Sequence, residues 1–324
     1  MYNLTFISAV TTPERAFESV PELKIFNVRF FTLADSEKKI IKEAGDTDFI
    51  MADAMGKISE ALIKSMPNLK LIQSEGVGYQ GVDVNAAKRY GVTVCNNKGI
   101  NDTAVAETAV MLILSCLKNS TAGSKAVYEG RQIEAKKASF GVVKELSQCT
   151  VGLIGFGDIA KATARLLSAF SPRILYSNRT RYPEIEQEYG VEYVSRRQLL
   201  EQSDFVSLHV AVCDDTRFMA DREFFAQMKN DAYLINTSRG ELVDNEALLQ
   251  ALLTSQIAGA GLDVIYPEPV AADNVILDDR IKDKLVLLPH IAGITNLTVQ
   301  KLYKNGYNNI MRIINGEKPL NIVG

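Results

Sequence analysis

The chain has 324 residues, of which 47% are hydrophobic and 23% are charged, and its formal net charge is −3. This composition is typical of a globular protein, and the length favours two domains. The slight negative charge and the lack of a long apolar run or signal peptide exclude the usual features of nucleic-acid-binding, membrane and secreted proteins. We therefore expect a cytoplasmic protein whose partners are neither nucleic acid nor membrane.

Cysteine and histidine usage narrows the chemistry further. The four cysteines form no CxxC pair, so we expect neither a metal site nor disulfides, which suits a reducing cytoplasm. Only two histidines, His209 and His290, are present. Because imidazole exchanges protons most readily near neutral pH, an acid–base assignment has only these two imidazoles to consider.

The first hundred residues alternate strand-like and helix-like segments. We predict strands over residues 4–10, 24–31, 48–52, 69–74 and 92–95, and helices over residues 36–44, 59–66 and 85–90. This alternation indicates a parallel sheet covered by helices on both faces. An apolar helix over residues 103–118 follows, and we expect it to be buried, between domains. Residues 120–148 are more polar and are expected to run along the surface.

The alternation restarts at residue 150. Six strands are predicted over residues 150–155, 174–177, 205–210, 233–236, 261–264 and 285–288, with helices over residues 159–170, 196–201, 223–229 and 246–254. Six such strands complete one doubly wound nucleotide-binding domain. A last helix over residues 296–315 is expected to pack back on the N-terminal block.

A glycine-rich turn joins the first strand of this second set to its helix. Gly155 permits a tight turn, Gly157 lets the backbone approach a pyrophosphate, and Ala160 allows close helix–strand packing. The phosphates would then lie at the helix N-terminus, where free N–H groups favour anions. The alternative is that the glycines merely connect a strand to a helix.

The end of the next strand bears on the choice of cofactor. NAD sites usually carry Asp or Glu there, but this chain has Ser177, followed by Arg179 and Arg181. No carboxylate repels a 2′-phosphate, and two guanidinium groups are available to pair with it. We therefore expect NADP(H) to be preferred, with NAD(H) as the alternative if these arginines are ordinary surface charges.

Three further strand ends carry polar side chains that suit hydride transfer to a 2-keto acid. Arg239 can hold the substrate carboxylate and polarise the keto oxygen, and His290 can protonate that oxygen. Glu268 can fix the tautomer of His290 and keep a proton available. Each residue taken singly could be structural: a turn for Glu268, an ion pair for Arg239, a buried histidine for His290.

Together these motifs resemble the D-isomer-specific 2-hydroxyacid dehydrogenases over nearly the whole chain. The matching segments are residues 151–160, Leu208-His209, residues 236–240, residues 261–268 and Pro289-His290. The resemblance implies catalysis by Arg239, Glu268 and His290. It also implies that the N–H groups of a loop containing Gly76, Val77 and Gly78 bind the substrate carboxylate, and that Arg239 and His290 contact the substrate as well.

The resemblance also places Asp263 at the nicotinamide amide and lines the cofactor with Thr237 and Ser238. With the glycine turn and neighbouring loops, the expected cofactor-binding residues are Thr103, Gly155, Gly157, Asp158, Ile159, Ser177, Asn178, Arg179, Thr180, His209, Ala211, Thr216, Thr237, Ser238 and Asp263.

The family pattern implies two Rossmann-like, doubly wound parallel-sheet domains with the active site in a cleft between them. Residues 1–100 and 294–324 would form a discontinuous, flavodoxin-like substrate-binding domain, and residues 101–293 the NAD(P)-binding domain. Such proteins are typically homodimers, to which the helix over residues 103–118 is expected to contribute.

Some positions depart from the family pattern. Ala211 stands where proline is usual, and Ser177 replaces the usual Asp. No aromatic residue follows His290, which favours the glyoxylate/hydroxypyruvate reductase and phosphoglycerate dehydrogenase branch over the lactate dehydrogenase branch. The leading function is thus reduction of a small 2-keto acid. The alternatives are a non-catalytic NAD(P) sensor or corepressor-like protein, and a dehydrogenase for phosphite or formate.

Overall fold

The computed structural model describes residues 1–323, and the chain divides into two compact units. One unit comprises residues 1–101 and the C-terminal segment from Ile294, and the other comprises residues 102–293. The first boundary lies one residue from the one expected from the family pattern, and the second coincides with the expected one. Gly324, the last residue of the predicted segment 294–324, lies outside the described residues.

The first unit is built on a five-stranded parallel sheet with the order β2-β1-β3-β4-β5. This is the flavodoxin-like order, in which the chain changes direction across the sheet between β1 and β3. Its elements are β1 Asn3–Ile7, α1 Pro13–Ser19, β2 Asn27–Phe31, α2 Glu37–Ala44, β3 Phe49–Ala52, α3 Glu60–Lys64, β4 Leu71–Ser74, α4 Val84–Arg89, β5 Thr93–Cys95 and α13 Asn296–Ile314.

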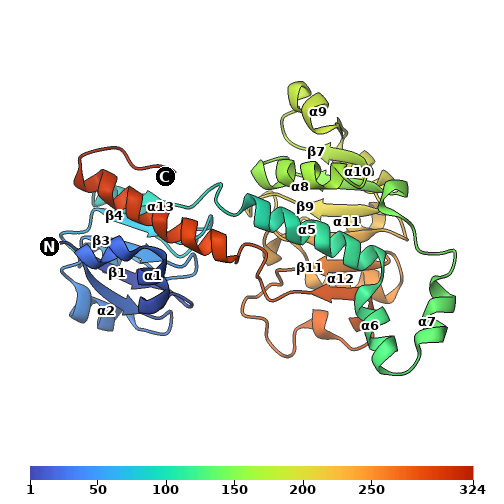
Figure 1. The fold of residues 1–324 in the computed structure, drawn as a ribbon, viewed down its shortest axis with the longest axis horizontal. Helices are drawn as coiled ribbons and strands as arrows, with labels where there is room; N and C mark the ends of the chain where they lie inside the picture. The colour runs from blue at the N-terminus through green and yellow to red at the C-terminus, as the bar shows by residue number, and fades with distance from the viewer. Residues whose placement is uncertain (324) are drawn as a thin grey trace. The chain divides into compact units, whose positions relative to one another are not determined.

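The second unit is built on a seven-stranded parallel sheet with the order β12-β11-β10-β9-β6-β7-β8 (Figure 1). It is the Rossmann order extended by one strand, with the switch point between β6 and β9. Its elements are α5 Asp102–Leu117, α6 Ser120–Tyr128, α7 Gln132–Ser139, β6 Thr150–Ile154, α8 Asp158–Ser168, β7 Arg173–Ser177, α9 Pro183–Tyr189, β8 Val191–Tyr193, α10 Arg196–Gln202, β9 Phe205–Leu208, α11 Arg222–Gln227, β10 Tyr233–Asn236, α12 Asn245–Leu253, β11 Gly259–Leu262 and β12 Leu285–Leu287. The predicted fold class of two parallel α/β domains is confirmed.

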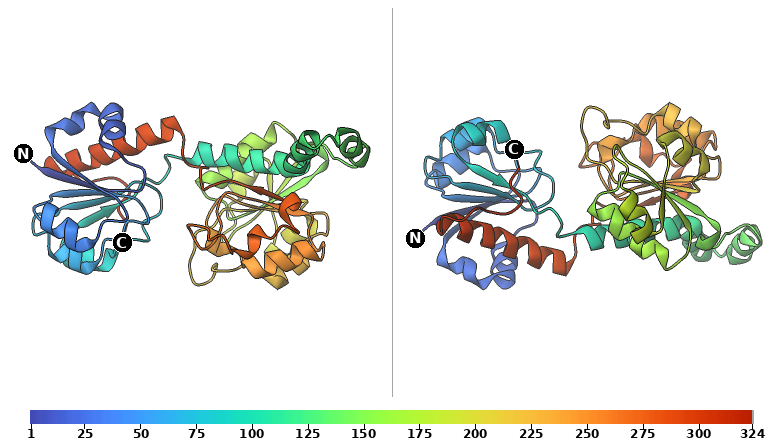
Figure 2. Two further views of the ribbon diagram at one scale, coloured as in Figure 1. Left: turned by 90° about the horizontal axis from the view of Figure 1, so that it is seen from below. Right: turned by 90° about the horizontal axis from the view of Figure 1, so that it is seen from above.

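Helices cover both faces of each sheet (Figure 2). In the first unit, α13 packs on β4 and α1, and its Tyr303 and Ile310 lie in the same apolar core as Phe6 of β1. Asn309 donates a 2.8 Å hydrogen bond from Nδ2 to Oε1 of Gln73, so the helix is also attached by a buried polar contact. The C-terminal helix thus belongs to the same compact unit as the N-terminal strands.

The apolar helix α5 packs on α8 and on β10, β11 and β12 of the seven-stranded unit. It approaches β11 closely, because a Cβ on Gly261 would lie only 3.0 Å from the Cβ of Leu112. Its apolar circumference is therefore explained by burial within this unit. The expectation that the helix is buried between domains is not needed to account for its sequence.

Several local predictions were wrong. The second sheet has seven strands rather than six, because β8 is a three-residue edge strand, too short to show an alternating pattern. The first strand ends at Ile7, and the missed helix α1 follows with Thr12 as its N-cap and Pro13 in its first turn. Residues 120–148 contain the helices α6 and α7, and a further helix, α9, precedes β8.

Strand ends near glycine and proline were also displaced. The segment predicted as one strand over residues 24–31 begins with a 3-10 turn, Pro21–Ile25, so that β2 starts only at Asn27. β11 runs from Gly259 to Leu262 rather than over residues 261–264, because its two glycines conceal the strand pattern. Within residues 1–323, no helix is both long and apolar enough to cross a membrane.

Candidate active site

The turn between β6 and α8 has the geometry of a phosphate-binding turn. Gly155 has a φ of +88°, and a Cβ there would lie 2.5 Å from the carbonyl oxygen of His209, so no other residue fits. Gly157 is the N-cap of the eleven-residue helix α8, and no side chain caps this N-terminus. A Cβ on Gly157 would meet no heavy atom within 4 Å, which leaves open space before the helix. Free N–H groups and the helix dipole therefore face a space that a pyrophosphate can fill.

Two buried polar atoms at neighbouring strand ends support a ligand in the same place. Nδ1 of His209, after β9, and Oγ1 of Thr237, after β10, have no hydrogen-bond partner among the described residues. Buried polar atoms are rarely left unpaired, so both fit a polar ligand such as a dinucleotide.

Burial lowers the pKa of His209 to about 4, and Nε2 of His209 lies 2.9 Å from Oγ of Ser207. His209 is therefore neutral at pH 7 and unsuited to be a second acid.

The two arginines that follow β7, Arg179 and Arg181, differ in their contacts. Arg181 donates to both carboxylate oxygens of Glu186, at 2.7 Å and 2.8 Å, and its guanidinium lies 5.7 Å from the ring centre of Tyr193. Arg179 is exposed and makes no ion pair in the described part of the chain. The expectation that both arginines are available to a 2′-phosphate therefore narrows to Arg179, beside Ser177, Asn178 and Thr180.

The other predicted cofactor residues lie in the loop after β9 and at helix starts. The hydroxyl of Thr216 accepts the Cys213 N–H at 2.8 Å and donates to the Ala211 carbonyl at 2.7 Å, so Thr216 shapes this loop. Asp158 and Ile159 open α8, with Ala160 buried behind them, and Thr103 is exposed in the first turn of α5.

Backbone hydrogen bonds align the ends of β10, β11 and β12. Asp263 N–H donates to the Asn236 carbonyl at 3.0 Å, and His290 N–H donates to the Asp263 carbonyl at 2.8 Å. The turn with Arg239 therefore lies at the same sheet edge as Asp263 and His290. Parallel strands bring such residues together although 51 positions separate the first catalytic candidate from the last (290 − 239).

Arg239 is half-buried and has no carboxylate partner among the described residues. Its Nη1 donates to the Ser238 carbonyl at 2.7 Å, and its own carbonyl accepts from Asn236 Nδ2 at 2.8 Å. Gly240 packs so tightly that a Cβ would lie 2.5 Å from the backbone nitrogen of Tyr266. This close contact places the Arg239 turn against the segment that leads to Glu268. An unpaired, half-buried guanidinium is suited to an anionic ligand.

Glu268 and His290 form a direct pair. Nδ1 of His290 lies 2.6 Å from Oε1 of Glu268. Because an ionised carboxylate can only accept, Nδ1 carries the hydrogen and Nε2 is left to exchange a proton with a substrate. His290 has a φ of +57°, which is uncommon for a residue with a side chain.

Asp263 stabilises this unusual backbone. The residue is 1% exposed, and its two carboxylate oxygens accept the N–H groups of Ile291 at 2.8 Å and Ala292 at 2.9 Å. From the family resemblance, Asp263 was expected only at the nicotinamide amide. The structure adds a positioning role, since this carboxylate holds the loop that carries His290.

In the five-stranded unit, the loop after β4 leaves two adjacent backbone N–H groups without an acceptor among the described residues. Asn97 N–H donates to the Gly76 carbonyl at 2.8 Å, and Asn96 Nδ2 donates to the Val77 carbonyl at 2.9 Å. The Gly78 carbonyl accepts from the Ser74 hydroxyl. The N–H groups of Val77 and Gly78 have no acceptor in the described part of the chain. Adjacent free N–H groups of this kind bind carboxylates and phosphates.

Asn96 and Asn97 were not among the site residues predicted from the sequence. The side chain of Asn97 also donates to the Ser74 and Glu75 carbonyls, both at 3.1 Å, and its oxygen accepts from Asn305 of α13. Two successive asparagines directly after an apolar strand were the available signal. Asn96 and Asn97 thus bind carbonyl groups of the loop, and the N–H groups of Val77 and Gly78 remain available to a ligand.

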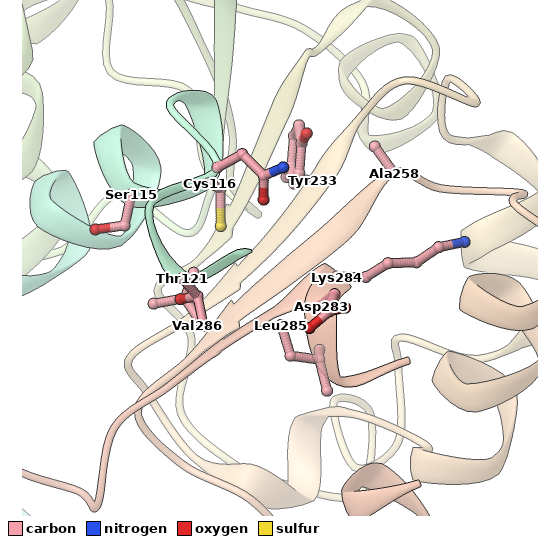
Figure 3. A pocket seen from close by; sticks show the side chains of 10 residues that line it. Ser115, Cys116, Thr121, Tyr233, Ala258, Asp283, Lys284, Leu285 and Val286 are labelled. Atoms are coloured by element: carbon pink, nitrogen blue, oxygen red, sulfur yellow. The ribbon is translucent and has the colours of Figure 1, made fainter. Parts of the chain in front are cut away.

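A pocket of about 130 Å³ in the seven-stranded unit lies elsewhere (Figure 3). Its lining includes Tyr233 and Leu285, which begin β10 and β12, and Cys116 near the end of α5. The pocket is therefore at the amino ends of the strands, opposite Arg239 and His290. Ligands of open α/β sheets bind at the carboxyl ends, so this pocket is not part of the candidate active site.

Comparison with known proteins agrees with this geometry. A family model for the NAD-binding domain of the D-isomer specific 2-hydroxyacid dehydrogenases matches residues 110–292. A glyoxylate reductase from Korarchaeum cryptofilum is 33% identical over 96% of this chain and 93% of its own length. The chain belongs to the D-isomer specific 2-hydroxyacid dehydrogenase family. The predicted family and the predicted class, an oxidoreductase of 2-hydroxy acids, are confirmed.

Solved structures of the family contain either nucleotide. An NADPH-dependent glyoxylate/hydroxypyruvate reductase from Sinorhizobium meliloti, in complex with NADP and malonate, aligns with a TM-score of 0.84 at 27% identity, covering 100% of this chain and 97% of that chain. A D-lactate dehydrogenase from Aquifex aeolicus, complexed with NAD and lactic acid, aligns with a TM-score of 0.82 at 28% identity, covering 97% and 96%. A nicotinamide dinucleotide is thus the cofactor class, and the residues after β7 bear on which one is preferred.

Proposed function

We propose that this dehydrogenase reduces a small 2-keto acid of the glyoxylate or hydroxypyruvate kind to the D-2-hydroxy acid, with NADPH as the preferred reductant. The pair of Glu268 and His290, at the sheet edge that also carries Arg239, is the observation on which the proposal rests. The similarity to a glyoxylate reductase supports the choice of substrate. A purely sensory protein would have no use for a free histidine nitrogen and an unpaired guanidinium at the same sheet edge.

The proposed roles follow from the geometry of each group. Arg239 holds the substrate carboxylate and draws electron density from the keto oxygen, and the N–H groups of Val77 and Gly78 bind the same carboxylate. His290 donates a proton from Nε2 to the keto oxygen as negative charge develops there. Throughout the reaction Glu268 accepts a hydrogen bond from the Nδ1–H group of His290, and its negative charge stabilises the imidazolium. A bound nicotinamide supplies the hydride that reduces the keto carbon.

The test is initial-rate reduction of glyoxylate, hydroxypyruvate, pyruvate and a branched 2-keto acid, each with NADPH and with NADH. We expect glyoxylate or hydroxypyruvate with NADPH to give the highest kcat/KM. If both nucleotides bind and neither is oxidised with any of these acids, the proposal is wrong and the sensor alternative replaces it.

Arg179 is proposed to pair with the 2′-phosphate of NADPH. Replacing Arg179 with alanine is expected to raise KM for NADPH by about 10-fold to 100-fold, the value of a charge-assisted hydrogen bond of about 1.5–3 kcal/mol. KM for NADH should change little, because its ribose carries no phosphate. Steady-state titrations of both nucleotides at saturating keto acid measure the effect.

Arg181→Ala is the matched control for this prediction. Because Arg181 is already paired with Glu186, its loss should leave the ratio of the two KM values unchanged. Equal effects of Arg179→Ala on NADPH and NADH, or a larger change in the ratio for Arg181→Ala, would contradict the assignment.

We also propose that the protein is a homodimer formed through α6, α7 and the segment after them. Tyr128 is 90% exposed and Phe140 is 85% exposed, and Val127, Ile133 and Val142 are exposed beside them in sequence. α7 stands clear of the sheet to which it is connected (Figures 1 and 2). Apolar patches of this kind on a single chain usually mark an interface. The dimer contact expected of α5 stays a prediction beside this one.

Replacing Tyr128 and Phe140 together with aspartate is expected to convert the dimer to a monomer, because two charges cannot be buried in an apolar interface. Size-exclusion chromatography with light scattering measures the mass. Glu18→Lys, an exposed change of charge on α1 of the other unit, should leave the dimer intact. A wild-type protein that is monomeric, or a double variant that remains dimeric, would contradict the proposed interface.

A further inference from the structure

A buried carboxylate that none of these steps uses lies directly before the anion-binding loop. Glu75 follows β4 and is 6% exposed. Its Oε2 accepts a 2.7 Å hydrogen bond from the Ser8 hydroxyl, and its Oε1 accepts one of 2.7 Å from the Thr11 hydroxyl. Both donors lie in the loop after β1, at the sheet position where the strand order reverses. Glu75 is therefore at the ligand-binding edge of the five-stranded sheet.

Among the described residues, no cation pairs with Glu75. Burial raises the pKa of Glu75 to about 7, against the effect of the Ser8 and Thr11 hydroxyls, and the negative charge of Asp53 at the end of β3 raises it further. Tyr303 reaches in from α13, and burial raises its own pKa. Arg15 of α1 donates to the Val10 carbonyl rather than to Glu75.

The hydrogen-bond chain around Glu75 can accommodate both of its charge states. Oη of Tyr303 lies 2.8 Å from Oγ1 of Thr11, and either atom can be the donor. With Glu75 ionised, Tyr303 donates to Thr11 and Thr11 donates to Glu75. With Glu75 protonated, Thr11 can accept from the carboxyl group and donate to Tyr303. Reversal of two hydroxyl groups therefore lets the carboxyl group gain a proton without breaking the network.

Glu75 is also connected rigidly to the free N–H groups of Val77 and Gly78. Its N–H donates to the Ala52 carbonyl at 2.7 Å, and its carbonyl accepts from Asn97, which also holds Gly76. A carboxylate bound by the loop would place a second negative charge near a buried one. Like charges in a region of low dielectric disfavour each other's ionised form.

We propose that Glu75 is a positioning residue that makes binding of the 2-keto acid depend on uptake of a proton. Resting on the proposed function, the inference extends it to regulation of the same site. The protein binds its anionic substrate best when Glu75 is neutral and the loop carries no adjacent charge. Substrate affinity then falls as the pH rises through the neutral range, independently of His290, which acts on kcat.

KM for glyoxylate, measured at saturating NADPH between pH 5.5 and pH 8.5, tests the proposal. One coupled proton allows a rise in KM of up to about tenfold per pH unit above the pKa of Glu75. We expect about a fivefold to tenfold rise in the wild-type protein between pH 6.5 and pH 8 and less than about twofold in Glu75→Gln. The pH dependence of kcat should be the same in both proteins. Glu18→Gln, an exposed change on α1, should keep the wild-type profile of KM.

Two further measurements keep the test decisive if Glu75→Gln does not fold. In Asp53→Asn, loss of the nearby negative charge should shift the rise in KM to lower pH, which a purely structural role of Asp53 would not do. Calorimetry of oxamate, an unreactive 2-keto acid isostere, binding to the NADPH-loaded protein at pH 7 in two buffers of different ionisation enthalpy should show proton uptake.

The outcomes separate this inference from the proposed function. If wild-type protein reduces none of the 2-keto acids, the proposed function fails and the inference falls with it. If wild-type protein turns over with a KM that is independent of pH, if Glu75→Gln keeps the wild-type profile, or if oxamate binds without proton uptake, the inference alone is overturned.

Discussion

Replacing His290 with asparagine is expected to lower kcat for 2-keto acid reduction by about 10²-fold to 10⁴-fold, the usual contribution of a general acid. Asparagine is chosen because His290 has a φ of +57°, a conformation that asparagine adopts more readily than most residues. The backbone bonds to Asp263 should therefore survive, and the loss should report the missing proton donor. Stopped-flow oxidation of NADPH under single-turnover conditions measures the chemical step directly.

Cofactor binding is the control for this variant. The affinity for NADPH should remain within about twofold of the wild-type value, because His290 contributes to protonation rather than to binding energy. The chain has no tryptophan, so the emission of the nicotinamide itself reports binding without energy transfer from an indole. Glu268→Gln should have a smaller effect on kcat than His290→Asn, since the imidazole remains. Turnover near the wild-type rate in His290→Asn would contradict the proposed mechanism.

Replacing Arg239 with glutamine is expected to lower kcat/KM by about 10³-fold to 10⁴-fold, because both the charge and the paired donors are lost. Arg239→Lys keeps the charge but lacks the planar fork, and we expect it to lose about 10²-fold to 10³-fold. The two variants thus separate charge from geometry. Initial rates over a range of keto acid concentrations give kcat and KM for each.

Arg217 provides the matched control for Arg239. Its guanidinium is stacked 4.9 Å from the ring centre of Phe218 and 5.5 Å from that of Tyr266. Arg217→Lys changes the same side chain in the same unit and should keep kcat/KM near the wild-type value. Arg239→Lys retaining more than about a third of wild-type kcat/KM would mean that no bidentate contact is made in the transition state.

The main strands of both sheets could be predicted because parallel, buried strands appear as short continuous apolar runs. β6, β9 and β10 are buried along almost their whole length, and each has a polar or glycine-rich segment directly after it. This local pattern placed Gly155, Arg239 and His290 at strand ends. The order of such segments along the chain was also sufficient for the family to be proposed before the fold was known.

Elements with little apolar surface could not be predicted in the same way. β8 has three residues and pairs with β7 alone among the described strands, and α7 has no buried residue. α7 buries no residue and β8 buries Val191 alone, so neither shows the periodicity from which a helix or strand is inferred. The exposed apolar residues of α6 and α7 similarly become informative only when their exposure is known.

Hydrogen-bond partners were decided by the tertiary structure because sheet order joins residues that are distant in sequence. Ser8 and Thr11 are 67 and 64 positions from Glu75, and Ile291 is 28 positions from Asp263. The same is true over a shorter separation for the two arginines after β7. Arg181 pairs with Glu186, whereas Arg179 has no ion-pair partner among the described residues. The chemistry available to the protein could thus be read from residue types at strand ends. Which of those side chains are free, which are paired and which are buried with a raised pKa depends on neighbours that only folding supplies.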